Sequence, residues 1–128
     1  AGSAEFGAPD GLWFDYFGRL WIMTDQQGDG TGDFQKVGSN TMLCADPNTK
    51  EIRRFLTSPN QCEVTGMTST PDGRSFFVGI QHPGENALAA NPTEFSKWPG
   101  NQFGGPTDRP RAAVLVITRT DGGVVGAA

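Results

Sequence analysis

The sequence has few of the residues that most directly indicate a catalytic or metal site. It contains two cysteines and one histidine in 128 residues. Two cysteines are too few for a disulfide framework, and Cys44 and Cys62 lack the spacing of a zinc site. We expect each to be a buried thiol, because free cysteine commonly behaves as a small core hydrophobe. With one histidine, His82, no histidine-rich metal cluster can be built from this chain.

Two further absences narrow the class of partner. No run of about 18 apolar residues occurs, so no membrane-spanning helix is expected. The net charge is −4 and the basic residues form no long run, which argues against nucleic acid as a partner. The opening residues, AGSAEF, include neither an initiator methionine nor a signal peptide. They are expected to be either an added segment or a cut within a longer chain.

Turn-forming and aromatic residues are abundant in the chain. There are 18 glycines, nine prolines, nine phenylalanines and three tryptophans. Short strands joined by tight turns accommodate this composition better than helices do. The sequence therefore predicts an all-β fold.

An internal repeat organises the expected strands. Starting at Gly11 and again at Gly66, a glycine and a short strand lead to a Gly-Arg turn and then to an aromatic-rich strand. In the second halves, Asp46-Pro47-Asn48 and Asp121-Gly122-Gly123 are typical hairpin turns. The repeat predicts two units of four antiparallel strands, at about residues 8–60 and 63–127, with an insertion over residues 83–110.

Repeated four-stranded units are typical of the blades of a β-propeller. Two blades cannot close a ring, so the predicted fold class is an all-β propeller fragment of about two blades. Strand edges and blade faces would then need cover from the remainder of a propeller chain or from self-association. We expect aromatic side chains to lie in the core between blades, namely Trp13, Trp21, Phe76 and Phe77.

Three motifs resemble the C-terminal part of the PhoX-type alkaline phosphatases. They are Cys62-Glu63-Val64-Thr65-Gly66, Ile80-Gln81-His82-Pro83-Gly84-Glu85, and Arg109-Pro110-Arg111 followed by VLVITR. The resemblance runs from about Phe6 to Gly126. It implies part of a six-bladed propeller with its active site at the mouth of the central channel. It also implies a periplasmic or extracellular phosphatase that hydrolyses phosphate monoesters with Fe³⁺ and Ca²⁺.

The same resemblance makes Glu63 the first candidate metal ligand. Glu63 precedes the first strand of the second repeat, which lines the channel in a propeller. Without the resemblance, a solvated turn glutamate would be the simpler interpretation. The remaining ligands, including the family's iron-binding cysteine, would come from sequence outside this chain, so the chain alone is expected to be inactive. No catalytic residue is assigned.

Asp10 is the second candidate metal ligand, at the corresponding point of the first repeat. Its Pro-Asp-Gly context is also an ordinary turn sequence, as is expected for Asp72. Gluconolactonase-like propellers use such an aspartate on their channel metal. A gluconolactonase-like hydrolase is therefore one alternative function, and a non-catalytic propeller scaffold is another.

Four other features of the sequence have interpretations that do not require a metal or phosphate site. Residues 25–33 resemble the start of a calcium-binding EF-hand loop, but Lys36 stands where a glutamate is required, so a polar loop is expected. His82 has either a structural role or a contact near the site. Arg109 and Arg111 could bind phosphate, but we expect them to hold the insertion against the sheet.

Overall fold

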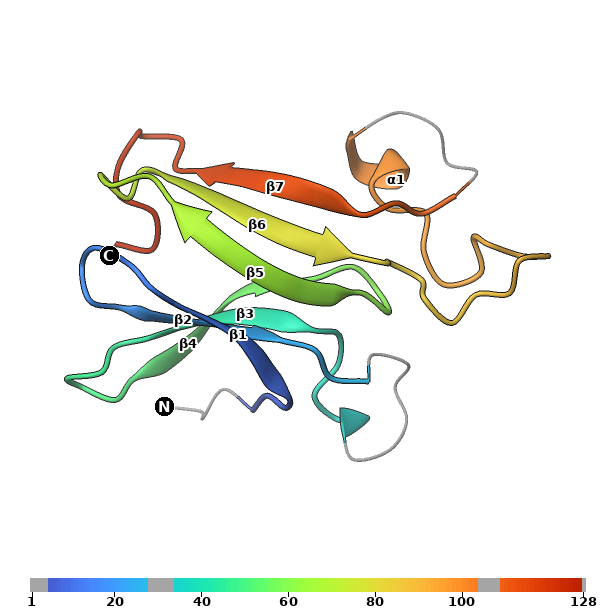
Figure 1. Ribbon diagram of the computed structural model, residues 1–128, viewed down its shortest axis with the longest axis horizontal. Coiled ribbons are helices and arrows are strands. Elements are labelled where there is room, and N and C mark those ends of the chain that lie inside the picture. Colours follow the sequence, from blue (N-terminus) through green and yellow to red (C-terminus); the bar gives the residue numbers. More distant parts are fainter. Residues whose placement is uncertain (1–4, 28–33, 104–108, 128) are drawn as a thin grey trace.

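The computed structural model describes residues 5–27, 34–103 and 109–127, which form two antiparallel sheets (Figure 1). The only helix in these ranges is one turn long, and it is far too short to cross a membrane. The predicted all-β class is confirmed. The elements, in chain order, are β1 (Pro9–Phe14), β2 (Leu20–Thr24), β3 (Thr41–Ala45), β4 (Ile52–Thr57), β5 (Glu63–Ser69), β6 (Ser75–Gln81), α1 (Gly100–Phe103) and β7 (Ala113–Thr118).

The first sheet is a meander with the strand order β1-β2-β3-β4. Its register places Trp13 opposite Trp21, and Trp21 opposite Cys44. Asp46 directly follows β3 and starts the predicted turn to β4, where its carboxylate accepts a hydrogen bond of 2.8 Å from the Asn48 N–H. The four strands predicted for the first repeat are therefore all present.

The second sheet has the order β5-β6-β7, and the fourth strand expected after β7 is not found in the described residues. Asp121 and Gly122 form the predicted turn, but the chain beyond it does not pair with β7. Instead, the Val125 N–H donates a hydrogen bond of 2.9 Å to the carbonyl oxygen of Gly73. The Val125 side chain is buried in the core. Burial of this valine between the sheets diverts the terminal segment from the β7 edge.

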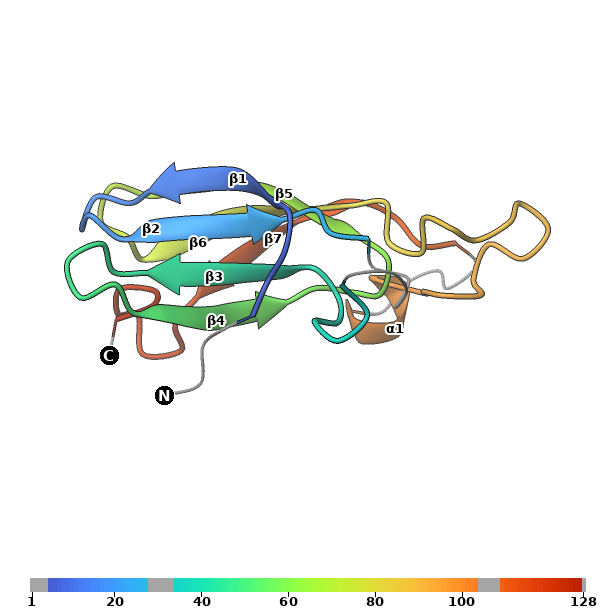
Figure 2. The same ribbon diagram turned by 90° about the horizontal axis from the view of Figure 1, so that it is seen from below.

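The two sheets pack face to face around an apolar core (Figures 1 and 2). Trp21 of β2 lies at its centre, fully buried, with its ring 4.8 Å from that of Phe76 on β6. A second ring, that of Phe55 on β4, lies 5.0 Å from Trp21. Both contacts are close to perpendicular, the edge-to-face arrangement that aromatic pairs prefer. These rings join the two sheets.

The aromatic residues predicted for the core divide between two faces. Trp21 and Phe76 are fully buried, and Trp13 packs partly buried against the same cluster. Phe77 does not lie in the core between these two sheets, because 39% of that residue is exposed, and its place in a core with further blades stays a prediction. Successive side chains of a strand point to opposite faces of the sheet, so Phe77 points outward when Phe76 points inward.

The described residues of the insertion are irregular apart from α1, as its composition predicted. Trp98 anchors it in the core with only 4% of its surface exposed, while Phe95 is half-buried. The Phe103 side chain lies outside the described part. Arg109 and Arg111 are exposed, and neither side chain makes an ion pair within the described residues. The Arg111 N–H does donate a hydrogen bond of 3.0 Å to the Trp98 carbonyl, so Arg111 holds the insertion through its backbone and not through an ion pair, while the expectation for Arg109 stays a prediction.

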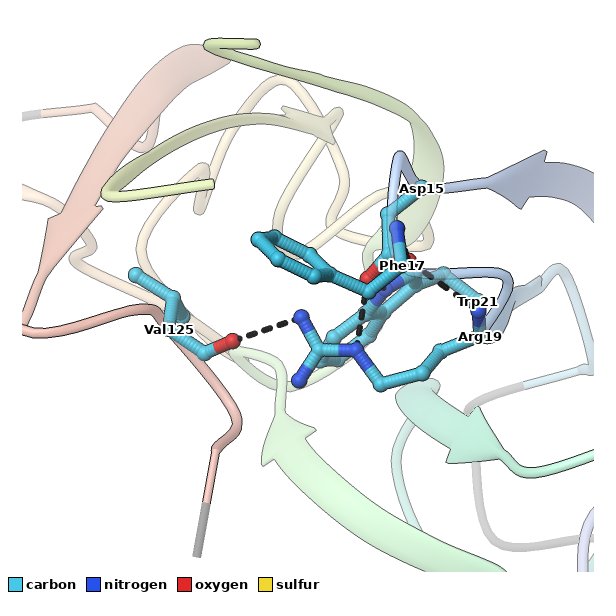
Figure 3. Close-up of polar contacts among 5 residues, drawn as sticks. All are labelled: Asp15, Phe17, Arg19, Trp21 and Val125. Carbon is cyan, nitrogen blue, oxygen red and sulfur yellow. Dashed lines mark hydrogen bonds and ion pairs between the residues drawn. The ribbon is translucent and has the colours of Figure 1, made fainter. Parts of the chain in front are cut away.

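A buried carboxylate fixes the turn between β1 and β2 (Figure 3). Asp15 is 6% exposed, and its side chain accepts four hydrogen bonds of 2.7–3.0 Å. Their donors are the backbone N–H groups of Phe17 and Arg19, the guanidinium of Arg19 and the indole of Trp21. Arg19 also donates to the carbonyl oxygen of Val125 at 2.9 Å. One carboxylate thus connects the turn, the core tryptophan and the terminal segment.

Burial by itself disfavours the charge of Asp15, but the hydrogen bonds from Trp21, Arg19 and Phe17 outweigh it and lower the pKa of this carboxyl from 3.8. We expect Asp15→Asn to lower the free energy of unfolding at pH 7 by about 2–3 kcal/mol, because charged hydrogen bonds are lost and Arg19 loses its counter-charge. Urea denaturation of both proteins measures this difference.

The pH dependence supplies the control for this prediction. A carboxyl whose pKa is lowered by folding stabilises the protein above its unfolded pKa, and this stabilisation disappears as the pH falls through the folded value. The difference between wild type and Asp15→Asn should therefore shrink below pH 3.8. Asp46→Asn, in an exposed turn, should cost less. A difference that is constant from pH 7 to pH 2 would contradict the role assigned to the charge.

Candidate functional site

Four carboxylates and the single histidine gather at one end of the two sheets, the end to which β2 and β6 point in Figure 1. Asp10 lies at the start of β1, Asp25 directly follows β2, and Glu63 is the first residue of β5. His82 and Glu85 follow β6. Antiparallel pairing explains the gathering, because a strand start lies beside the end of its neighbour.

The register confirms this juxtaposition within each sheet. Pro9 pairs with Thr24, which places Asp10 beside the strand end that leads to Asp25. Glu63 itself pairs with Gln81, the last residue of β6. The internal repeat therefore places acidic groups at equivalent positions of the two sheets.

A β-bulge and a glycine bring β1 close to β5 at this end. The register of β1 shifts between Pro9 and Gly11, so Asp10 is the extra residue of a bulge, a feature that redirects side chains. A Cβ atom added at Gly11 would lie 2.8 Å from the carbonyl oxygen of Thr65 on β5. Only glycine permits this approach of the two strands, and the approach brings Asp10 towards Glu63.

Glu63 lies mostly buried among other charged groups. Its side chain is 13% exposed, and one carboxylate oxygen lies 3.5 Å from Nε2 of His82. Burial raises the pKa of the Glu63 carboxyl, repulsion from Asp25 and Asp10 raises it further, and contact with His82 partly offsets these effects. The carboxylate of Glu63 is therefore close enough to Asp25 and Asp10 for their charges to act on it.

His82 lies between two glutamates. Its Nε2 faces Glu63, and its Nδ1 lies 3.5 Å from a carboxylate oxygen of Glu85. Nδ1 is buried and has no hydrogen-bond partner. The backbone of His82 has a φ of 36°, a conformation uncommon for residues other than glycine. Of the two roles left open by the sequence, the structure supports a contact near the candidate site.

Hydrogen bonds join the segments that precede β5 and follow β6. The N–H of Gly84 donates to the carbonyl oxygen of Asn60 at 3.0 Å, and the N–H of Glu85 donates to that of Gln61 at 3.1 Å. The Gln61 side chain also accepts a bond of 3.3 Å from the N–H of Asn86. A hollow of about 260 Å³ lies beside this junction, and Asp25, His82 and Glu85 are among its lining residues.

The donor chemistry of this end suits a hard cation, but the set is incomplete. Carboxylate oxygens are the ligands that calcium prefers, and ferric iron also favours oxygen. A cation would relieve the repulsion felt by Glu63. Within the described ranges, however, no three His, Cys, Asp or Glu side chains lie close enough to hold a metal ion. Metal binding by Glu63 and Asp10 therefore stays a prediction, and the residues fit as part of a larger ligand set.

The two cysteines stand apart from this chemistry. Both are free; Cys62 is buried and Cys44 is half-buried. Burial raises the pKa of the Cys62 thiol to about 11 and also raises that of Cys44. Because the thiolate is the form that binds metal, these thiols are poor ligands. The buried thiol predicted for Cys62 is confirmed.

Two weaker sequence signals have clear outcomes. Asp72 lies in a turn, where its carboxylate accepts hydrogen bonds from the Thr70 hydroxyl and the Arg74 N–H, as predicted. Asp29 and Gly30, on which the comparison with a calcium loop depends, lie outside the described residues. Asp25 and Glu85 were not predicted for the site. The signal that could have identified them is that each lies in the segment after the second strand of its repeat, Asp25 directly after β2 and Glu85 a few residues after β6.

The geometry defines an all-β protein of two packed sheets with acidic groups at one shared end, and comparison with known proteins identifies its family. The family described as alkaline phosphatase PhoX matches residues 1–84, about two thirds of the sequence. The chain therefore belongs to the PhoX alkaline phosphatase family. Among curated proteins, no match was found.

A solved structure supports the same assignment. Pseudomonas fluorescens PhoX, in complex with the transition-state analogue vanadate, is similar to this chain with 53% sequence identity and a TM-score of 0.79. The match covers 93% of this chain but 19% of the solved one. The sequence thus spans about a fifth of the length of that phosphatase.

The close approach of β1 and β5 generates a stability prediction. We expect Gly11→Ala to lower the free energy of unfolding by about 1–3 kcal/mol, because the added methyl group would meet the Thr65 carbonyl and the Met23 side chain. Chemical denaturation measures the change. The control is Gly66→Ala, where no atom lies within 4 Å of the added Cβ. Equal losses for both variants would contradict the role assigned to Gly11.

Proposed function

We propose that the chain is the C-terminal part of an exported, metal-dependent propeller phosphatase that hydrolyses phosphate monoesters. Membership of the PhoX family supports the phosphatase activity of the intact protein. The observation that carries the role of this chain is the gathering of Glu63, Asp25 and Asp10 at one end of the sheets, set by the strand register. Such a group of carboxylates is stabilised by a bound cation.

In this proposal, Glu63 and Asp10 are metal ligands, and the ions are calcium and ferric iron. When bound, such ions polarise phosphoryl oxygens and neutralise the charge that develops on the leaving oxygen. Glu63 and Asp10 supply hard oxygen donors from the two sheets. His82 contacts the Glu63 carboxylate and restricts its orientation. The other ligands come from parts of the protein outside these 128 residues.

Vanadate resembles a phosphoryl group in transfer. The relative from P. fluorescens was solved with this transition-state analogue, which favours phosphate-ester hydrolysis over the gluconolactonase-like alternative. The substrate proposed for the intact protein is a phosphate monoester, and the proposed location is the periplasm or the extracellular space.

The outer faces of both sheets support the proposal that further blades cover them. On the first sheet, Leu12 and Phe14 are each 63% exposed. On the second, Val114 and Val116 of the edge strand β7 are exposed beside Phe77. A hollow of about 610 Å³ runs along β7 and is lined by all its residues. Exposed apolar surface of this kind marks an interaction site, and we propose the remainder of the propeller chain as its partner.

The first functional test is Glu63→Gln in the full-length protein. We expect kcat/KM for a chromogenic phosphate monoester to fall by about 100-fold or more, because a charged group that acts in the transition state is lost. Bound calcium and iron, measured by elemental analysis, should fall as well. Glu51→Gln, in the exposed turn between β3 and β4, is the matched control. Unchanged metal content and activity in Glu63→Gln would instead favour the non-catalytic scaffold.

The second test compares the 128-residue chain with the full-length protein. With calcium and ferric iron supplied, the isolated chain should not hydrolyse the same monoester above background, because its ligand set is incomplete. Light scattering of the isolated chain should show self-association through its uncovered faces. Turnover by the chain at the rate of the intact enzyme would overturn the proposed division of the site.

A further inference from the structure

A buried asparagine connects the two sheets at the candidate site. Asn40 directly precedes β3 and is 2% exposed. Its side-chain oxygen accepts hydrogen bonds of 2.8 Å from the Thr24 hydroxyl and 2.7 Å from the Gln26 N–H. Its amide group donates bonds of 2.9 Å to the Gln26 carbonyl and 2.7 Å to the Cys62 carbonyl. All four hydrogen bonds of which the amide is capable are made.

These bonds reach the segments next to two of the carboxylates. Thr24 and Gln26 flank Asp25, which the first sheet contributes, and Cys62 immediately precedes Glu63 on the second. Asp25, Asn40 and Cys62 line the same hollow, and both Asp25 and Glu63 are carboxylates. Like charges separate unless the backbone holds them. Asn40 supplies such a restraint, because a single rigid amide plane binds both segments.

We propose that Asn40 is a positioning residue that sets the spacing between Asp25 and Glu63 and so prepares this end of the sheets for a cation. The inference rests on the proposed function and extends it to a residue that is not itself a metal ligand. Both polar atoms of the Asn40 side chain are already engaged in hydrogen bonds.

Asn40→Asp in the full-length protein tests the restraint most directly. Aspartate has nearly the same shape and keeps the acceptor for Thr24 and Gln26, but it loses the donors to the Gln26 and Cys62 carbonyls. We expect calcium affinity, measured by titration of the metal-free protein, to fall about 10–100-fold, the usual effect of removing a group that orients a ligand. If the new charge prevents folding, Asn40→Ser replaces this variant. Serine is uncharged, and its side chain is too short to bond to both the Gln26 and the Cys62 segments.

Two controls separate positioning from general stability. Asn60→Asp makes the same substitution at an exposed site in the segment before β5, and it should keep wild-type affinity. Asp15→Asn destabilises the opposite end of the β1–β2 hairpin and should also keep wild-type affinity when measured well below its melting temperature. In the metal-free Asn40 variants, the Glu63 amide should exchange hydrogen faster than in Asp15→Asn, and in Asn40→Ser, which loses the acceptor, the Gln26 amide should do so as well.

The outcomes are distinct. Weaker calcium binding in the Asn40 variants alone would support the proposal, and high calcium should then restore their activity. Equal affinity in the Asn40 variants and wild type, or an equal loss in Asp15→Asn, would overturn it. A wild-type protein that hydrolyses no phosphate ester and binds no metal would refute the proposed function, and with it this inference.

Discussion

The buried charge of Asp15 is the interaction on which the arrangement of the two sheets depends. Removing a carboxylate from water is costly unless its charge and lone pairs are matched, and here four donors match them. One donor is the indole of Trp21, whose ring centres the core. Another is Arg19, which also donates to the carbonyl oxygen of Val125 in the terminal segment that follows β7. The orientation of the central tryptophan and the path of the terminal segment thus share one anchor.

The opposite end of the two sheets carries the candidate site. There, Asp10, Asp25 and Glu63 lie at one shared end, and within the described residues the basic side chain that contacts Glu63 is His82. Asn40, the bulge at Asp10 and the close contact at Gly11 hold these groups in place. The carboxylate at one end has all its hydrogen bonds, whereas the other end contains His82 in an uncommon backbone conformation. Strained backbone of this kind is typical of a scaffold that supports a binding site.

Much of this organisation could be predicted from the sequence because it follows local rules. Gly18 and Gly73 adopt the positive φ expected of turn glycines, and alternation of side chains along strands explains the burial of Phe76. Repeat position predicts both Glu63 and Asp10, family resemblance supports Glu63, and both residues lie at the shared end. The predicted fourth strand of the second sheet was wrong for the described residues, because Val125 is buried in the core instead of pairing beside β7.

The sequence by itself determined the all-β class, the repeat, the turn positions and the family, since these depend on residue types and spacings along the chain. Only the tertiary structure decided that Asp25 and Glu85 join the candidate site and that Asn40 spans the two sheets. These relations depend on strand register and on contacts between residues far apart in sequence, such as Asn40 and Cys62. A single asparagine before a strand carries no local signal of the partner that its amide will find.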